Sequence, residues 1–362
     1  MKQSLLALFM VFCISTVGCG KSDGTSVTPT KPSGKETPSS KRPGSIGIIG
    51  DTANVVKPVN GGMVLMGGGT DVEAAFRWMM ARSGGGDVVI LRASGTDAYN
   101  AFVNALGTVN SVETLLINSR ELANDDGVAY IIRNAEMVFI AGGDQSDYMK
   151  YWKGTKTEQA LNYLLNDKKA PVGGTSAGCA ILGGFYYSGE TGGLTSAQAL
   201  ANPYHTNVTL YNNDFLKAPY LQNVITDQHY LTRDREGRSL VFLGRINKDF
   251  SVQAKCIAVD ERTAVCIDKD GKAQVLGDYS ATRAYSYAYF INPDATKQPE
   301  QFEANQKVIW NNNGKAVSVY EIAASVHGSG SFNVATFKAS EASGGKWYSW
   351  WIDNGVLNKK DQ

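Results

Sequence analysis

Residues 174–178 read Gly-Thr-Ser-Ala-Gly and lie between two short, mainly apolar runs at 170–172 and 179–182. A serine with a glycine two residues away on either side, at a strand-to-helix turn, is the pattern of a nucleophile elbow. The glycines are needed because the turn leaves no room for side chains. The helix that follows directs backbone N–H groups at any negative charge that develops beside Ser176. The stretch therefore predicts a strand, a tight turn and a helix with a reactive serine.

Strand-like and helix-like segments alternate on the N-terminal side of this turn. Apolar runs at 63–66, 87–91, 114–117 and 137–141 predict strands, and the segments between them predict helices. This alternation predicts an α/β fold, with a mostly parallel sheet covered by helices on both faces. Ligands of such sheets bind at the carboxyl ends of the strands. We therefore expect the glycine-marked strand ends at 67–69, 142–143 and 173–174 to converge on one crevice.

The N-terminus has the features of an exported protein. Lys2 precedes an apolar run at 5–12 that is too short to cross a membrane as a mature helix. Residues 16–19, Thr-Val-Gly-Cys, resemble a bacterial lipoprotein processing site. Cys19 would then be lipidated and anchor the protein to a bacterial cell membrane, on its periplasmic or cell-surface side. The alternative is a plain signal peptide with a coincidental cysteine.

Residues 20–44 are rich in Ser, Thr, Lys, Pro and Gly, which predicts a flexible tether. Towards the C-terminus the alternation of strand-like and helix-like segments becomes irregular, and Asn, Ser, Gly, Tyr and Trp accumulate. We therefore divide the chain into a lipoprotein signal peptide (1–18), a tether (19–44), an α/β domain (45–291) and a β-rich C-terminal extension (292–362). The net charge of +1, without a Lys/Arg cluster, argues against a nucleic-acid partner.

Three cysteines remain after Cys13 and Cys19 are assigned to the signal and its processing site. Cys256 and Cys266 lie on two strand-like runs around the polar turn 260–262, so they can face each other across a hairpin. An exported location permits a disulfide there. Two buried free thiols are an equal alternative, because sequence does not fix the geometry of a disulfide. Cys179 is interpreted as a small packed residue of the helix after the elbow.

A serine nucleophile needs a base, and the base needs an orienting carboxylate. The chain has three histidines, and His229 is the best candidate because it follows an apolar strand, whereas His205 and His327 lie in irregular segments. Three arginines come directly after His229 and can clamp a carboxylate through paired hydrogen bonds. The alternative is an exposed helix start whose arginines pair with the acidic residues among them.

Four motifs together resemble the cyanophycinase-like serine peptidase family, in that family's order. They are Gly142-Gly143-Asp144-Gln145, the elbow at 173–178, Thr226-Asp227-Gln228-His229-Tyr230 with the arginines after it, and Asp260-Glu261-Arg262-Thr263-Ala264. The resemblance covers about residues 62–291. It implies a class I glutamine amidotransferase-like, flavodoxin-like fold and hydrolysis of Asp/Arg-containing peptides, such as β-Asp-Arg, by a serine exopeptidase or isopeptidase.

The resemblance also assigns roles to residues. It implies a triad of Ser176, His229 and Glu261, which acts through an acyl-enzyme, and oxyanion donors at the backbone of Ala177 and Gly143. Substrate contacts are implied at Gln145, Asp227, Gln228, Arg233, Arg235 and Arg238. No cofactor or metal is expected, and a homodimer is suggested by analogy alone.

Two other functions are alternatives to this one. A surface lipoprotein could bind peptides or glycans without turnover, although it would not need all three members of a triad. An amidohydrolase that releases ammonia from glutamine would use a cysteine at the elbow in related folds, and this chain has Ser176 there. The order Ser, His, Glu also differs from the Ser, acid, His order of α/β-hydrolases.

Overall fold

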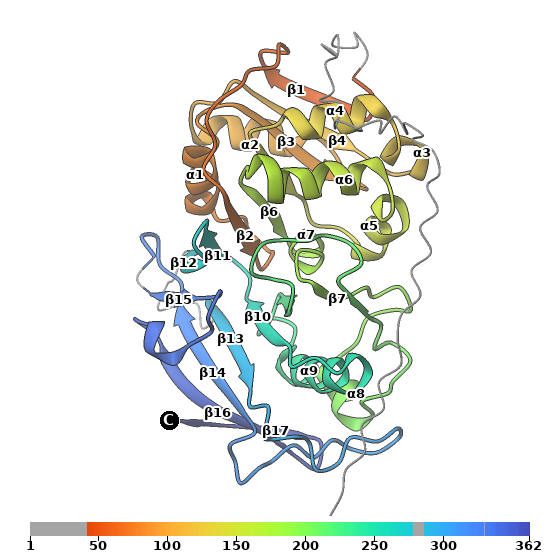
Figure 1. Ribbon diagram of the computed structural model, residues 1–362, viewed down its shortest axis with the longest axis vertical. Coiled ribbons are helices and arrows are strands. Elements are labelled where there is room, and N and C mark those ends of the chain that lie inside the picture. Colours follow the sequence, from red (N-terminus) through yellow and green to blue (C-terminus); the bar gives the residue numbers. More distant parts are fainter. Residues whose placement is uncertain (1–41, 278–285, 329) are drawn as a thin grey trace, which may run out of the picture. The chain divides into compact units, whose positions relative to one another are not determined.

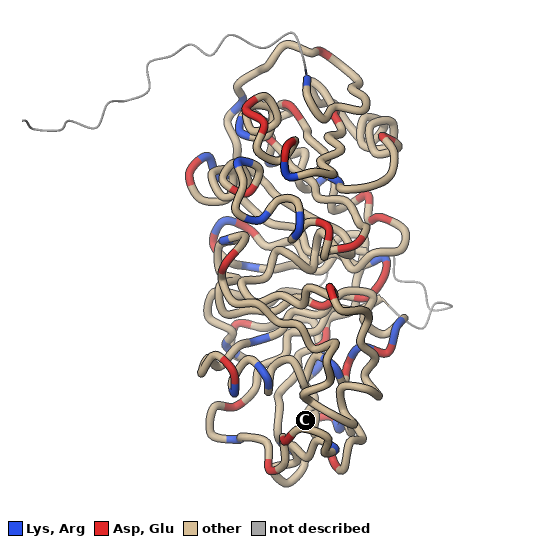
Figure 2. The backbone as a smooth tube through the Cα atoms, turned by 90° about the vertical axis from the view of Figure 1, so that its right-hand side faces the viewer, with Lys and Arg blue, Asp and Glu red and all other residues tan. Residues whose placement is uncertain are grey.

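A computed structural model describes residues 42–277, 286–328 and 330–362 (Figure 1). The chain divides into two units, 1–39 and 40–362, and the features below all belong to the second. The expected signal peptide, Cys19 and the tether up to residue 41 lie outside the described residues. None of the described helices combines the length and the apolar character that a membrane crossing requires. Lys and Arg are interspersed with Asp and Glu along the described chain (Figure 2).

Nine strands form the first sheet, and its centre is parallel. The strands β4, β3, β5, β6 and β2 run parallel to one another, and the remaining strands pair antiparallel at the two sides. In spatial order the sheet consists of β1 (Ser45–Gly50), β4 (Ser111–Leu116), β3 (Asp87–Arg92), β5 (Met137–Ile140), β6 (Val172–Thr175), β2 (Gly62–Met66), β11 (Thr263–Asp268), β12 (Lys272–Gly277) and β15 (Ser331–Asn333).

Helices cover both faces of this sheet, because successive strand residues point to opposite sides. On β2, Val64 and Met66 belong to the core under one set of helices, and Met63 and Leu65 belong to the core under the other. The first set is α1 (Glu73–Arg82) and α2 (Ala98–Leu106). The second set is α3 (Arg120–Ala123), α4 (Asp126–Asn134), α5 (Gln145–Trp152), α6 (Lys156–Tyr163), the π-helix η1 (Leu164–Lys168) and α7 (Ala177–Ala180). The predicted α/β fold, with helices on both faces, is confirmed.

A second, mostly antiparallel sheet of eight strands follows. Only β9 pairs parallel with its neighbours β10 and β7 among the described strands of this sheet. Its spatial order is β17 (Val356–Asp361), β16 (Lys346–Asp353), β14 (Val317–Ala323), β13 (Tyr287–Pro293), β10 (Lys255–Val259), β9 (Val224–Gln228), β7 (Phe185–Tyr187) and β8 (Leu210–Asn212). The helices α8 (Ser196–Ala201) and α9 (Glu236–Phe250) pack on one face, and a 3₁₀ helix, η2 (Ala339–Glu341), lies near the C-terminus.

The C-terminal strands are part of this architecture. The expected boundary at 291 falls inside β13, and β14, β16 and β17 continue the second sheet beyond it, whereas β15 joins the first. The face of the second sheet opposite α9 contributes Ile257, Phe290 and Ile322 to the same core that lies under α4 to α7. The β-rich region is therefore present, and it shares its hydrophobic core with the α/β part.

Of the two alternatives for Cys256 and Cys266, the structure has the buried free thiols and not the disulfide, because the two residues belong to different sheets. Cys256 on β10 lies opposite Ile225 and Ile291, and Cys266 on β11 lies opposite Val64 and Gln274. The two strands therefore do not form the predicted hairpin. Cys256 packs in the core under α9, Cys266 packs in the core under α1, and both are buried free thiols.

Candidate active site

The elbow around Ser176 has the predicted geometry. Ser176 joins the end of β6 to the start of α7 with φ 51° and ψ −116°, a conformation that non-glycine residues rarely adopt. A Cβ atom on Gly174 would lie 2.5 Å from the Gly178 carbonyl carbon, and one on Gly178 would lie 2.2 Å from the Ile140 oxygen. Both flanking positions therefore exclude a side chain, as the sequence pattern predicted.

Ser176, His229 and Glu261 form a hydrogen-bonded chain. The Ser176 Oγ lies 2.7 Å from His229 Nε2, and His229 Nδ1 lies 2.6 Å from Glu261 Oε1. Because a carboxylate only accepts, Nδ1–H donates to Glu261 and Nε2 is left to accept the Ser176 hydroxyl proton. Of the other two histidines, His205 accepts a hydrogen bond from the Asn207 amide instead.

The three residues come from separate elements, and the end of β2 holds them together. His229 directly follows β9 of the second sheet, and Glu261 lies in the connection from β10 to β11, which crosses from the second sheet to the first. Three successive carbonyls at the end of β2 accept backbone hydrogen bonds from these segments: Met66 from Ser176 at 3.1 Å, Gly67 from His229 at 2.8 Å, and Gly68 from Arg262 at 2.9 Å.

The glycine-marked strand ends do converge, as the sequence predicted. A Cβ atom on Gly68 would lie 2.3 Å from His229 Cε1, and one on Gly142 would lie 3.3 Å from the Ser176 Cβ. Gly69 packs in the same way against Glu261, at 3.1 Å. The backbone at these strand ends can therefore approach the side chains of Ser176, His229 and Glu261 only because glycine has no Cβ atom.

The electrostatic surroundings keep His229 neutral. Burial lowers the pKa of the imidazole, and the positive charges of Arg233 and Arg235 lower it further, whereas the hydrogen bond to Glu261 raises it. The net effect is a pKa below the ordinary value, so the ring is unprotonated at neutral pH. A neutral imidazole with a free Nε2 lone pair is the form that can accept a proton from Ser176.

Two backbone amides are available beside the serine. Ala177 is the first residue of α7, and Gly143 lies in the loop between β5 and α5 next to Gly142. Within the described residues, neither amide donates a hydrogen bond to another backbone or side-chain group. Both N–H groups are thus free to bind an oxygen that carries negative charge.

Arg238 and Asp227 differ from what the sequence predicted for them. Their exposed fractions are 2 % and 1 %, and Arg238 Nε donates to Asp227 Oδ2 at 2.9 Å. Arg238 Nη1 also donates to the Leu194 carbonyl, and the Ser239 hydroxyl donates to the same Asp227 carboxylate. The two charges pair with each other inside the protein. Both side chains are too deeply buried to make the predicted contact with a substrate.

The other predicted substrate contacts lie closer to solvent, except for Gln228, which is buried. Arg235 is half-buried and donates to the Gln228 carbonyl at 2.7 Å, and burial, followed by the charge of Arg238, lowers the pKa of its guanidinium to about 10. Arg233 is exposed and forms no ion pair with any described residue. Gln145, at the start of α5, donates to the Tyr187 carbonyl at 3.4 Å. Arg233 is therefore the cation here that is most open to an incoming anion.

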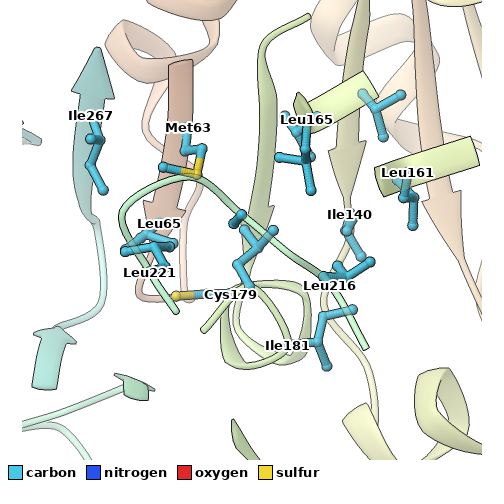
Figure 3. Close-up of a cluster of buried hydrophobic side chains, with 14 of the residues drawn as sticks. Met63, Leu65, Ile140, Leu161, Leu165, Cys179, Ile181, Leu216, Leu221 and Ile267 are labelled. Atoms are coloured by element: carbon cyan, nitrogen blue, oxygen red, sulfur yellow. The ribbon is translucent and has the colours of Figure 1, made fainter. Parts of the chain in front are cut away.

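Cys179 does not belong to this reactive group. Its side chain is fully buried, and Figure 3 shows its sulfur within an apolar cluster, near Leu65 and Leu221. Burial raises the pKa of the thiol well above its ordinary range. The cysteine three residues after the elbow is therefore a packed side chain, as expected from the sequence.

The model of the peptidase family S51 matches residues 93–275, about half of the chain. The chain belongs to this family. Among curated proteins, this S51 chain is 28 % identical over 171 residues to a cyanophycinase of Trichormus variabilis, a match that covers 47 % of the chain and 52 % of the relative. It is 27 % identical over 252 residues to a cyanophycinase of Synechococcus elongatus, which covers 65 % and 73 %.

The S51 chain thus spans about half the length of the first of these relatives. Among solved structures, a peptidase from an acI-B1 Actinobacterium is similar over 64 % of this chain and 91 % of its own, with a TM-score of 0.45 and 16 % identity.

Sequence reasoning missed two supports of the site. The carbonyls of Met66, Gly67 and Gly68 hold three segments by backbone hydrogen bonds, and the only sequence signal was the glycine run after a strand. Nothing in the sequence predicted that Asp227 and Arg238 are buried, because their burial depends on how α8 and α9 pack.

Proposed function

We propose that this member of the S51 family is a serine-type exopeptidase or isopeptidase that hydrolyses Asp/Arg-containing peptides, such as β-Asp-Arg or a related dipeptide. The observation that carries the proposal is the hydrogen-bonded chain from Ser176 through His229 to Glu261, with distances of 2.7 and 2.6 Å. It begins at an elbow whose strained backbone exposes the serine.

In the first step, the Ser176 oxygen attacks the carbonyl carbon of the scissile bond while His229 Nε2 takes the hydroxyl proton. Glu261 accepts the hydrogen bond from Nδ1–H and stabilises the imidazolium that forms. The negative charge on the former carbonyl oxygen is bound by the N–H groups of Ala177 and Gly143. Such donors, fixed before the reaction, typically contribute about 3–4 kcal/mol each to lowering the barrier.

In the second step, the imidazolium gives its proton to the leaving amine, and an acyl-enzyme remains on Ser176. A water molecule then attacks the ester carbon and gives a proton to Nε2, which restores the base. The ester breaks, the proton returns to the Ser176 oxygen, and the acid product leaves.

The arginines support a substrate with a carboxylate beside the scissile bond. Arg233 is exposed and free of ion pairs among the described residues, and Arg235 is held by the Gln228 carbonyl. A guanidinium binds a carboxylate through two parallel hydrogen bonds. The buried Asp227–Arg238 ion pair holds in place the segment that carries His229 and Arg235. The curated relatives are cyanophycinases, which agrees with an Asp/Arg substrate.

We further propose that the protein is exported and lipid-anchored through Cys19, as its N-terminal sequence suggests. The homodimer suggested by the family resemblance stays a prediction.

The test compares the unchanged protein with Ser176→Ala and with Ser340→Ala, an exposed serine on η2 that serves as the matched control. We expect Ser176→Ala to lower kcat/KM for β-Asp-Arg by about 10⁴-fold or more, since removal of a nucleophile alone has effects of this size or larger. Ser340→Ala should keep the full rate, and circular dichroism should show that both variants fold. Hydrolysis retained by a folded Ser176→Ala protein would overturn the assignment of the nucleophile.

A further inference from the structure

A hollow of about 400 Å³ lies at one side of the first sheet, and nothing in the proposed chemistry uses it. It lies between the last turn of α1 and the strands β12 and β15, which end the sheet on this side (Figure 1). Its volume is typical of small-molecule sites, which have about 300–1,000 Å³. Among the residues that line it are Trp78, Arg82, Lys272, Gln274, Ser331 and Ser343.

The polar floor of the hollow follows from strand alternation. Gln274 and Leu276 are two residues apart on β12, so their side chains point to the same face of the sheet. Leu276 belongs to the core under α1, and Ser331 on β15 lies directly opposite Gln274. Gln274 and Ser331 therefore extend the face that α1 covers, and they do so with polar side chains because α1 ends at Arg82.

The hollow is remote from the proposed triad. The strand β11 begins at Thr263, two residues after Glu261, and ends at Asp268, which also lines the hollow. At about 3.3 Å per residue, Thr263 and Asp268 are about 17 Å apart. A molecule in the hollow therefore does not contact the reactive serine.

Arg82 presents a positive charge without a partner to the hollow. Its Nε is buried and forms no hydrogen bond, and no described carboxylate lies within 4.0 Å of its guanidinium. The guanidinium lies over the Trp78 ring, 3.9 Å from the centroid, and this stacking fixes its plane. Burial lowers the pKa of the group, while the nearby charge of Asp268 raises it. A buried donor without a partner is unfavourable, and a bound anion would relieve this.

Other elements bring further donors to the hollow. Lys272 is exposed at the start of β12, and no described carboxylate lies within 4.0 Å of its ammonium group. The Ser331 and Ser343 hydroxyls lie 2.9 Å apart, and only one of them can donate to the other, so one hydroxyl hydrogen is left for a ligand. Asp268 Oδ1 accepts from the amides of Asp270 and Lys272, both at 2.9 Å. The two cations outnumber this carboxylate.

We infer that this hollow is a second binding site of the protein, which takes a phosphate or sulfate group, either as the free ion or as part of a small molecule. Its donors come from α1, β12 and β15, and three directions suit a tetrahedral oxyanion better than the two coplanar oxygens of a carboxylate. Arg82 binds two of the oxygens through parallel hydrogen bonds, and Lys272 pairs with the remaining charge. Trp78 flanks the organic part of an ester. The inference goes beyond the proposed function and does not depend on it.

Isothermal titration calorimetry of the full chain with phenyl phosphate tests the inference. Arg82→Gln should lower the affinity about tenfold or more, because it removes a charged contact with two hydrogen bonds. Lys272→Gln should lower it about threefold, because Lys272 is exposed. Asp268→Asn should raise it about threefold, because it removes a like charge and keeps an acceptor for the two amides. Lys248→Gln, an exposed lysine on α9, is the control and should leave the affinity unchanged.

Two further ligands define the chemistry of the site. Tighter binding of phenyl phosphate than of inorganic phosphate would support an ester as the ligand, and equal affinities would support the free ion. Benzoate, with a carboxylate in place of the phosphate group, should bind more weakly than phenyl phosphate. Circular dichroism should show that each variant folds.

Three results would overturn the inference. They are an absence of binding to the unchanged protein, an affinity for benzoate equal to that for phenyl phosphate, and binding that Arg82→Gln and Lys272→Gln both leave unchanged. Loss of binding in Arg233→Gln instead would place the anion at the proposed active site and would also overturn it. Hydrolysis of β-Asp-Arg is measured separately, so the proposed function stands in each of these cases.

Discussion

At the scale of single residues, the backbone of the site is strained at both ends of its central hydrogen bond. Ser176 has a φ of 51° and His229 a φ of 49°, values that are unfavourable for residues other than glycine. Such conformations cost about 1–3 kcal/mol each and persist only where the surroundings fix them. The carbonyls of Met66 and Gly67 do so, because each accepts a backbone hydrogen bond from one of the two residues.

The charges around His229 lead to a prediction about pH. Arg233 lowers the pKa of the imidazole, so Arg233→Gln should raise that pKa and move the acid limb of the pH profile of kcat/KM to higher pH. Arg233→Lys keeps the positive charge and should leave the limb near its original position, even if it weakens substrate binding. A limb that does not move in Arg233→Gln, or that moves to lower pH, would contradict the assignment of His229 as the titrating base.

The same group links pH to stability. Because folding lowers the pKa of His229, the folded protein binds this proton less readily than the unfolded chain. The neutral ring causes no loss of stability above the unfolded pKa of about 6.5. As the pH falls through that value towards the folded pKa, protonation of the unfolded chain makes unfolding more favourable.

At the scale of elements, the glycine run after β2 has a specific function. Gly68 has a φ of 98°, and a Cβ atom there would lie 2.3 Å from the His229 ring. Gly68→Ala should therefore displace the imidazole and lower kcat by about 100-fold or more, because displacements near 1 Å already have effects of this size. Gly193→Ala is the matched control, since no atom lies within 4 Å of its added Cβ. A Gly68→Ala protein that keeps the full kcat would contradict the requirement for glycine beside the His229 ring.

Elements could be predicted from the sequence where the pattern was local. The apolar runs of β2, β3 and β5 and the small-residue turn at Ser176 predicted a parallel sheet and a serine at a tight strand-to-helix turn, and the structure has both. The second sheet was harder to predict, because β7 and β8 have three residues each and their partners lie far away in the sequence. The hairpin expected around 260–262 was wrong for a related reason: its two arms are apolar runs typical of strands, but each arm pairs in a different sheet.

At the scale of the whole described unit, both sheets contribute to the hydrophobic core under α4 to α7, so they should unfold together. Trp350 on β16 is 1 % exposed and packs against Tyr289 with ring centroids 5.8 Å apart. Trp350→Ala should lower the free energy of unfolding by about 3–5 kcal/mol. Urea titrations followed by circular dichroism and by fluorophosphonate labelling of Ser176 should show the same shift of the midpoint.

The control for this experiment is Val356→Ala, whose side chain is 60 % exposed on β17. It should change the free energy of unfolding by less than about 0.5 kcal/mol. If labelling of Ser176 kept its original midpoint in Trp350→Ala while part of the dichroism signal was lost at lower urea, the C-terminal strands would be an independent domain.

Ser176, His229 and Glu261 come from segments of both sheets, so their hydrogen bonds can form only after the ribosome has synthesised all of these segments. A ribosome-bound chain that ends before His229 contains the serine but neither the imidazole nor the carboxylate, and Glu261 comes later still, in the crossing between the sheets. Such a nascent chain lacks two of the three groups of the proposed triad. Two separately expressed halves, divided between Ser176 and His229, would each be inert, and recovered labelling of Ser176 after mixing would report their complementation.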